Sequence, residues 1–438
     1  MTPFAADDPR TQIDAKPMLR AQWTIVAMMI GLNALDGFDV LSISFAAPGI
    51  AAAWGIDRAA LGIVLSLELV GMSLGSVLLG RLADRIGRRT TILWCLVVMT
   101  AGMAGAAAAG GILSLAGCRL LTGFGIGGML AATNAAVAEA ANARRRSLCV
   151  VLMAAGYPVG SVVGGIVAAR LLMSYDWRAI FVFGALATAA FIPLVLAAVP
   201  ESLPFLIQRG GRDALPRVNR LLARLGHDAI AHLPAATTER GGTPTAAALL
   251  RGAHRGALAT LTIAYLAHIM TFYFILKWIP KIVADLGFAP STAAGVLVWA
   301  SLGGATGSVL LGLLTGRARL LHLTVAAMIA STAMVVLFGF TGQRLAQLSI
   351  AAAAAGLCTN AGVVGLYALI AQTFPTELRA SATGIVIGIG RGGSAMAPAL
   401  AGWLFAAGIG LPGVATAMAL GSTVAALLLM AQRRRIVA

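Results

Sequence analysis

Two aspartates, Asp36 and Asp39, stand three residues apart inside the first long apolar stretch of the chain. A charged side chain at the centre of a bilayer costs about 2.5–3.5 kcal/mol on insertion scales, so acidic residues in such a stretch usually serve a function. On a helix both carboxylates share one face with Asn33, and we expect that face to turn toward a cavity rather than toward lipid. Because two close carboxylates do not both ionise cheaply, the pair predicts a proton site. The alternative is a structural one, a capped break of the helix around Gly37.

Two arginines, Arg119 and Arg391, lie within other apolar stretches. The planar guanidinium group matches a carboxylate with two hydrogen bonds, so a buried arginine favours recognition of an organic anion. The alternative is that each arginine neutralises a buried acid. Glycines flank Arg391 in "GIGRGGS" and leave room for a ligand, so we assign this arginine to substrate binding.

Glu68, Glu139 and His268 are also ionisable residues in apolar stretches. We place Glu68 in the substrate cavity. Glu139 precedes an arginine run, and we interpret it as a member of a gating ion pair that takes part in proton coupling. His268 is a candidate for substrate binding or proton relay, although a hydrogen-bonded core histidine is the commoner role.

The composition identifies the environment of these residues. Of 438 residues, 59% are hydrophobic and only 11% are charged, and the mean hydropathy is +0.90, which indicates an integral membrane protein. The net charge of +16 is better explained by membrane topology than by nucleic-acid binding. Four widely spaced cysteines predict neither disulfides nor a metal site, and no cofactor is implied. The amino terminus lacks the features of a signal peptide, so we expect the first apolar stretch to be retained.

Runs of about 20 mostly apolar residues, enough to span a bilayer, predict twelve helices at roughly 22–47, 60–80, 91–109, 112–138, 147–169, 179–199, 257–277, 291–314, 322–340, 346–372, 381–406 and 411–431. We therefore predict an all-α membrane protein of two six-helix bundles. The predicted units are a tail (1–21), an N-terminal bundle (22–200), a central loop (201–256), a C-terminal bundle (257–432) and a second tail (433–438). One short helix is expected in the central loop, near "ALPRVNRLLARLG".

Lysine and arginine counts predict the orientation. With the amino terminus inside, 24 of these residues fall on the cytoplasmic side and six on the other, so both termini and the central loop are expected in the cytoplasm. Lys277 is among the six that this count assigns to the outer side.

An internal repeat relates the two halves. "GSVLLGRLADR" at 75–85 recurs as "GSVLLGLLTGR" at 307–317, an offset of 232 residues that also aligns His268 with Asp36. Six helices per repeat keep the halves parallel, related by an axis along the membrane normal, and such an arrangement places a substrate cavity between them near the midplane.

Several motifs carry a family resemblance. "GRLADRIGRR" (80–89) resembles the loop between the second and third helices of the major facilitator superfamily. Five further motifs, in order, resemble the aromatic acid/proton symporter branch of that superfamily: "DGFD", "RLLTGFGIGG" with a later Glu, "DWRAIFVFG", "YFILKWIP" and "GVVGLYALIAQTFPTELRASATGIVIGIGRGGS". The resemblance covers most of the chain outside the tails and the central loop.

The resemblance implies residue roles and a function. Arg119 matches the arginine of the fourth helix, which implies proton coupling, and Phe38 and Tyr367 are candidate surfaces for an aromatic substrate. The implied function is import of a small organic anion, most simply an aromatic carboxylate of benzoate or hydroxybenzoate type, with protons by alternating access, across the inner membrane and as a monomer. The implied conformational gate consists of Gly80, Asp84, Arg85, Gly87, Arg88, Arg89 and Arg379.

Some residues depart from the family pattern. Asn142 replaces an expected proline, Gly316 replaces the acid that Asp84 supplies in the first half, and Glu68 stands where an apolar or small residue is expected. These departures concern the choice of substrate rather than the family.

Two other functions are alternatives to symport. A proton-coupled antiporter that exports drugs or metabolites is suggested by "GYPVGSVVGG" (156–165), although the glycine immediately before Pro158 is missing. An enzyme is disfavoured, because "GFGIGG" and "GIGRGG" lack the βαβ context of a nucleotide site and are better explained by close helix packing.

Overall fold

The computed structural model describes residues 9–211, 213–234 and 254–431, with the backbone alone at positions 81, 84, 376, 377 and 380. In these ranges the chain is helical and contains no strand, and twelve helices are long and apolar enough to span a membrane, which confirms the predicted class. The two ends of the chain, including the predicted tail 433–438, and much of the central loop lie outside the described residues.

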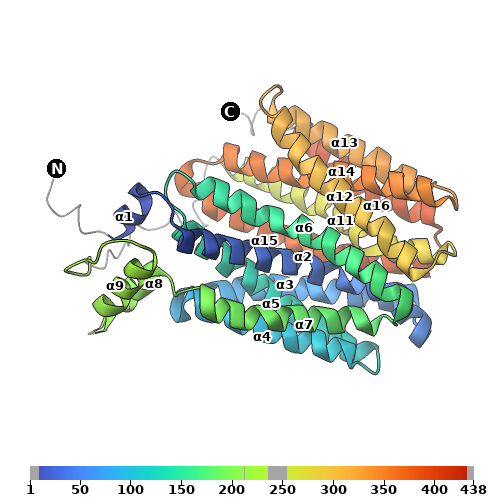
Figure 1. Cartoon of the computed structure of the whole chain (residues 1–438). Helices are drawn as coiled ribbons and strands as arrows, with labels where there is room; N and C mark the ends of the chain where they lie inside the picture. The colour runs from blue at the N-terminus through green and yellow to red at the C-terminus, as the bar shows by residue number, and fades with distance from the viewer. Residues whose placement is uncertain (1–8, 212, 235–253, 432–438) are drawn as a thin grey trace.

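The spanning helices form two sets of six. In Figure 1 the first set runs from blue to green and the second from yellow to red. The first set consists of α2 (Arg20–Trp54), α3 (Arg58–Ile86), α4 (Arg88–Ala107), α5 (Ile112–Ala140), α6 (Arg146–Ser174) and α7 (Arg178–Ala198). The second set consists of α11 (Arg255–Asp285), α12 (Pro290–Leu314), α13 (Leu320–Gly339), α14 (Leu345–Thr373), α15 (Thr376–Ala406) and α16 (Leu411–Ala431).

Small residues let the helices approach closely within each set. A Cβ atom on Gly71 or Gly75 of α3 would lie 2.2 or 1.9 Å from a backbone oxygen of α5. Their repeat counterparts, Gly303 and Gly307 of α12, meet backbone oxygens of α14 at 2.0 and 2.2 Å in the same way. The internal sequence repeat is thus matched by a repeated helix contact. Close backbone packing of this kind favours helix association in lipid.

Contacts between the two sets follow the same symmetry. α3 packs against α15 and α6 against α12, while α2 also meets α11. Because α12 and α15 are the repeat counterparts of α3 and α6, these two interfaces are images of one another. The line between the halves is therefore bordered by α2, α3, α6, α11, α12 and α15.

Short helices lie at the end of the molecule predicted to face the cytoplasm. α1 (Pro9–Ala15), α8 (Leu203–Arg209) and α9 (Ala214–Arg224) all lie beyond this end of the spanning helices (Figure 1). α9 confirms the short helix expected near "ALPRVNRLLARLG", whereas α1 and α8 had no counterpart in the prediction. Arg10 of α1 donates to backbone oxygens of Ala138 and Glu139, and so caps the end of α5.

One spanning helix is longer than predicted. The seventh span was expected to end at 277, but α11 continues without a break to Asp285. Lys277 consequently lies inside the helix and is fully buried, and the prediction that it belongs to the outer side is wrong. The apolar stretch "YFILKWIPKIV" on both sides of the lysine is what keeps it within the bundle.

Candidate functional site

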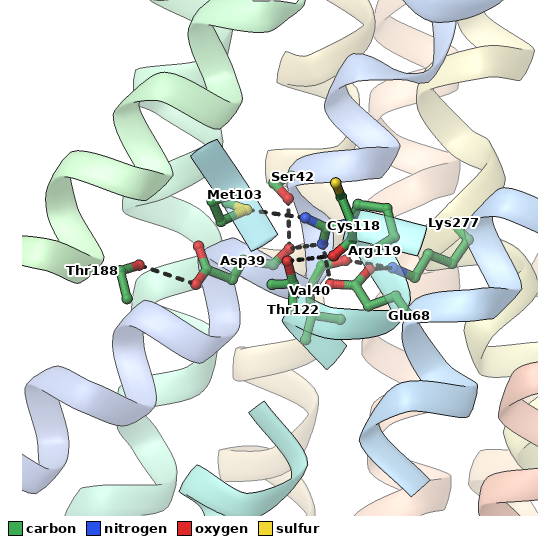
Figure 2. A network of polar contacts seen from close by, with 10 residues as sticks. All are labelled: Asp39, Val40, Ser42, Glu68, Met103, Cys118, Arg119, Thr122, Thr188 and Lys277. Atoms are coloured by element: carbon green, nitrogen blue, oxygen red, sulfur yellow. Dashed lines mark hydrogen bonds and ion pairs between the residues drawn. The ribbon is translucent and has the colours of Figure 1, made fainter. Parts of the chain in front are cut away.

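A buried carboxylate joins the two halves of the molecule. Glu68 of α3 accepts a hydrogen bond from Arg119 of α5 at one oxygen, and at the other oxygen from Lys277 Nζ of α11 at 3.0 Å (Figure 2). All three side chains are 0% exposed. Two cations on one buried carboxylate form a strong electrostatic cluster, and removal of Glu68 would leave both cations without a carboxylate.

Backbone oxygens of α2 complete this network. Arg119 Nη2 donates to Asp39 O at 3.0 Å, and Lys277 donates to Val40 O. Met103 Sδ lies 3.0 Å from Arg119 Nη1, and the guanidinium carbon lies 5.4 Å from the centroid of the Phe181 ring. Helices α2, α3, α5 and α11 are thereby tied together at one depth, with Lys277 as the contribution of the second half.

The two aspartates of α2 are buried, with Asp36 2% and Asp39 0% exposed. The Asp39 carboxylate points to α7, where Thr188 Oγ1 lies 3.5 Å from Oδ2, and Oδ1 has no partner among the described residues (Figure 2). Neither Asp36 oxygen has one either in that part of the chain. Asn33 donates to Met153 O of α6 at 2.7 Å. On this face Asn33 contacts α6 and Asp39 contacts α7, both in their own half, and the orientation of the face toward a cavity stays a prediction.

A carboxyl group buried without a hydrogen-bond partner is costly when ionised. Asp36 meets this description at both oxygens and Asp39 at one. Asp39 and Glu68 both interact electrostatically with Arg119, whereas Asp36 interacts with Asp39. The geometry therefore suits a pair in which one carboxyl carries a proton and the other contributes to the balance of the cations.

Arg391 lies at the boundary between the halves. It extends from α15 and donates to Met72 O of α3 at 3.1 Å, and it is half-buried. Tyr265 and Tyr273 of α11 both lie within electrostatic reach of it. Gly390 makes room for the Tyr265 ring, since a Cβ there would lie 1.9 Å from that ring.

A pair of tyrosines lies at the same boundary, where Tyr265 comes from α11 and Tyr367 from α14. Tyr265 and Tyr367 are hydrogen-bonded through their hydroxyl oxygens at 3.0 Å, with ring centroids 5.7 Å apart. Tyr367 is 41% exposed, and Tyr157 of α6 interacts electrostatically with it and with Tyr273. Of the two aromatic residues proposed for substrate binding, Tyr367 is hydrogen-bonded to Tyr265, which lies within electrostatic reach of Arg391. Phe38 instead packs edge-on against Phe183 within the first half, at 5.3 Å.

His268 lies in a fully hydrogen-bonded core. Its Nε2 donates to Thr359 O at 2.9 Å, because a carbonyl oxygen can only accept, and its Nδ1 lies 2.9 Å from Ser422 Oγ. Ser331 continues the chain at 3.1 Å from Ser422. This arrangement satisfies a neutral imidazole and joins α11, α13, α14 and α16 inside the second half, away from Arg391 and Glu68.

The gate residues of the first half lie around the ends of α3, α4 and α5. Arg88 pairs with Glu139 at 3.3 Å, and the Arg89 amide donates to Glu201 at 3.1 Å. Gly87 has φ of 99° and the Glu201 carboxylate fills the space where a Cβ would lie, so this turn requires glycine. Gly80 sits on α3 beside Ala131, Arg85 and Arg379 are exposed, and the side chain of Asp84 lies outside the described residues.

The halves are closed together at the predicted outer end. Arg58 pairs with Asp285 at 2.9 Å, and Ser66 accepts from the Ala399 amide at 3.0 Å. Toward the opposite end, Val77 on the same face of α3 is exposed, and the described residues leave open space beside Gly388 of α15.

Comparison with protein families gives a match over most of the chain. The model of the Major Facilitator Superfamily matches residues 29–349 and again residues 261–436. The chain belongs to the major facilitator superfamily. Two overlapping matches to one model agree with the internal repeat, and members of the superfamily are transporters rather than enzymes, here a multi-pass protein of the inner membrane.

Relatives within the superfamily belong to the aromatic acid/proton symporter family, and this chain is a member of it. A gallate transporter of Pseudomonas putida is 30% identical over 97% of this chain and 94% of its own length. The 4-hydroxybenzoate transporter PcaK of Pseudomonas aeruginosa is 29% identical over 95% and 94%, respectively. A 3-(3-hydroxy-phenyl)propionate transporter of Escherichia coli is 30% identical over 92% of both chains.

Solved structures of the superfamily share the fold. A bacterial homologue of the human lysosomal transporter Spinster, in an inward-facing and unoccupied conformation, superposes with a TM-score of 0.76 at 14% identity and covers 96% of this chain and 98% of that one. A D-xylose-proton symporter gives 0.71 at 19% identity, with 93% and 97% covered.

The sequence did not predict a role for Lys277, and it did not predict that Glu68 pairs with Arg119 and Lys277. Glu68 was assigned to the substrate and Arg119 to proton coupling, but the structure pairs them directly. The alternative considered for the arginines, neutralisation of a buried acid, is what the structure shows for Arg119. A lysine between "YFIL" and "WIP" was the signal that could have identified Lys277 as buried.

Proposed function

We propose that this member of the aromatic acid/proton symporter family imports a small aromatic carboxylate of benzoate or hydroxybenzoate type together with protons, by alternating access. The observation that carries the proposal is Arg391 at the boundary of the halves, where it contacts Met72 O of α3 and has Tyr265 and Tyr273 of α11 within electrostatic reach. The relatives named for gallate, 4-hydroxybenzoate and hydroxyphenylpropionate transport support the same substrate class.

Arg391 is the proposed partner of the substrate carboxylate. Its present acceptor is a backbone oxygen, which is neutral, so an incoming carboxylate offers it a stronger, two-pronged interaction. The Tyr265 and Tyr367 rings give an apolar surface for the aromatic ring of the substrate. Their hydroxyl groups can exchange hydrogen bonds with a phenolic hydroxyl group of the substrate.

Asp36 and Asp39 are the proposed proton site. Arg119 is the cation whose electrostatic interaction with Asp39 depends on whether the proton is bound. Asp39 connects the proposed proton site with Arg119. Its carboxylate faces Thr188, and its backbone oxygen accepts a hydrogen bond from Arg119. Symport of protons also solves an electrical problem for an anion entering a negative cell interior. Each proton carried inward removes about 2.3 kcal/mol per 100 mV of membrane potential.

The contact between Lys277 and Glu68 is the proposed link between proton binding and conformation. This ion pair crosses from α11 to α3, so separation of the halves at this depth must break it. A change in the charge of Asp39 alters the attraction of Arg119 for Glu68 and, through Glu68, the attraction that holds Lys277. The outer end can open only when this ion pair and the pair of Arg58 with Asp285 have both separated.

The test is uptake of radiolabelled 4-hydroxybenzoate by cells that express the protein, with and without a proton uncoupler. Accumulation that the uncoupler abolishes is expected. An excess of unlabelled gallate or benzoate should compete, whereas cyclohexanecarboxylate, which has the carboxylate but no aromatic ring, should compete weakly. Accumulation that survives the uncoupler contradicts proton symport, and extrusion of the label instead of uptake would support the antiporter.

A further inference from the structure

A cavity of about 430 Å³ lies at the predicted cytoplasmic end of the first half, where α8 and α9 meet the ends of α4 and α7. It is distinct from the network around Glu68, which lies within the spanning helices. Five arginines line it, together with a single acid, Glu201. The arginines are Arg89, Arg209, Arg217, Arg220 and Arg224.

The acid in this cavity is already engaged elsewhere. Glu201 Oε1 accepts from the backbone amides of Arg89 and Ser202 at 3.1 and 3.0 Å, and Oε2 lies 3.4 Å from Thr90 Oγ1. The bond from Arg89 satisfies an amide in the first turn of α4 that has no partner within the helix, and the bond from Ser202 holds the residue before α8. Glu201 therefore belongs to the turn between α3 and α4 and leaves most of the positive charge of the arginines uncompensated.

Two of the arginines hold the cavity in shape. Arg89 Nη2 donates to Leu196 O at 2.7 Å, and Arg224 Nη2 donates to Ala198 O at 3.2 Å, so both cap the last turn of α7. Carbonyl oxygens are neutral acceptors, and both guanidinium groups keep their full charge. The side chains of Arg217 and Arg220 are exposed on α9, and none of the carboxylates in the described residues pairs with them.

The cavity continues onto apolar surface that must face lipid. Thr90 lines it, and Trp94, one turn further along α4, is 60% exposed. Leu194 and Leu196 on the neighbouring end of α7 are also exposed, at 47% and 48%. In a spanning helix, large apolar side chains that are exposed in the protein lie against acyl chains. A ligand in this cavity thus has arginines at one end and a membrane-facing apolar surface at the other.

We propose that this cavity binds the phosphate headgroup of an anionic glycerophospholipid, with its acyl chains along α4 and α7. Arg217 and Arg220 contact the phosphate, while Arg89 and Arg224 supply charge from fixed positions. Basic pockets at the cytoplasmic level of spanning helices suit such headgroups, and clustered arginines gain affinity from the negative surface of an anionic leaflet. A bound lipid would hold α8 and α9 against the ends of α4 and α7.

The experiment uses the full-length protein in nanodiscs of phosphatidylcholine alone or of phosphatidylcholine mixed with phosphatidylglycerol. Native mass spectrometry after release from the discs counts retained phosphatidylglycerol. The variant Arg217→Gln/Arg220→Gln is compared with Arg317→Gln/Arg319→Gln, which removes two exposed arginines from the corresponding end of the second half. Wild type and the second variant should retain the lipid, and the first should retain it at least about tenfold less.

Folding and charge are controlled separately. Both variants should melt like wild type in phosphatidylcholine discs, because the four arginines are exposed, and Arg217→Lys/Arg220→Lys should keep most of the binding. Equal retention in all proteins, or equal loss in both glutamine variants, contradicts the site.

Inorganic phosphate is the second probe. If it raises the melting temperature of wild type but not of Arg217→Gln/Arg220→Gln, and phosphatidylglycerol is not retained, the cavity takes free phosphate and the lipid assignment is wrong.

Discussion

Asp36 of α2 and His268 of α11 stand 232 residues apart, at equivalent positions of the two halves, in opposite surroundings. Both oxygens of the Asp36 carboxyl lack a hydrogen-bond partner in the described chain, and a cluster of charged side chains lies one turn away. His268 is bonded at both ring nitrogens to neutral groups. The repeat has preserved the helix packing while the polar chemistry of this position has diverged.

The different surroundings of Asp36 and His268 indicate different roles for the two halves. A buried group without a partner has a protonation state that its surroundings can change, whereas a group with all bonds satisfied in a neutral form resists any change. We therefore expect the first half to carry the proton-dependent step. The second half contributes the rigid core around His268, and it reaches the first half through Lys277 and Arg391.

The largest effect is expected from Glu68→Gln. The amide leaves Arg119 and Lys277 without a carboxylate, and breaking a buried ion pair typically costs about 3–5 kcal/mol. Uptake of 4-hydroxybenzoate should fall on the order of 100-fold, and the purified protein should melt at a lower temperature. Lys281→Met, one turn beyond Lys277 and paired with Asp285 near the surface, is the matched control and should keep substantial uptake.

The double variant Glu68→Gln/Lys277→Met separates charge balance from mechanism. Removing both partners leaves no extra buried cation, so the melting temperature should recover toward wild type while uptake stays lost. If uptake recovers as well, the ion pair is only structural, and the proposed link between the halves fails.

Asp39→Asn and Asp36→Asn are expected to abolish accumulation of substrate against its gradient. Exchange of labelled for unlabelled substrate across proteoliposomes needs no net proton movement and should persist in at least one of them. Thr188→Val removes the hydroxyl group near Asp39 without touching charge, and it should shift the pH dependence of uptake without abolishing it. Normal accumulation by both asparagine variants would remove the first half from the proton step.

Arg391→Lys should raise KM for 4-hydroxybenzoate on the order of tenfold with a smaller change in the maximal rate. The charge remains, but the two-pronged contact with a carboxylate is lost. Tyr367→Phe is the companion variant, and it should weaken hydroxylated acids relative to benzoate by about two- to tenfold, the value of one neutral hydrogen bond. If Arg391→Lys leaves KM unchanged, the substrate carboxylate binds elsewhere.

Helix number and the two equivalent halves could be predicted from the sequence because they depend on long apolar runs and on the repeat. The first glycine of "GSVLLG" in each half, Gly75 or Gly307, lies at the interface of α3 with α5 or of α12 with α14. Charge partners depend instead on the rotation of each helix about its axis. Glu68, Arg119 and Lys277 come from three helices far apart in sequence, and a period of 3.6 residues leaves their relative rotations open.

Helix length was the second source of error. A helix needs about 20 residues to span a bilayer, but α11 has 31. A helix end predicted from apolar length alone therefore fell at Lys277, before the end that the structure shows. The same limit applies to Asp36 and Asp39, which share one face of α2 and are both buried. The direction of that face, toward α6 and α7, depends on packing that no single stretch of sequence contains.

The smallest effect on transport is expected from His268→Gln, which tests the other side of the comparison. Glutamine can donate to Thr359 O but does not reproduce both bonds, so a loss of about 1–3 kcal/mol in stability is expected. The pH profile of uptake should keep its shape, because the neutral imidazole contributes no titration to transport. Ser422→Ala should show the same lower melting temperature with the same profile. A pH profile that moves with His268→Gln but not with Ser422→Ala would make the histidine a proton carrier, and the two halves would then share the proton step.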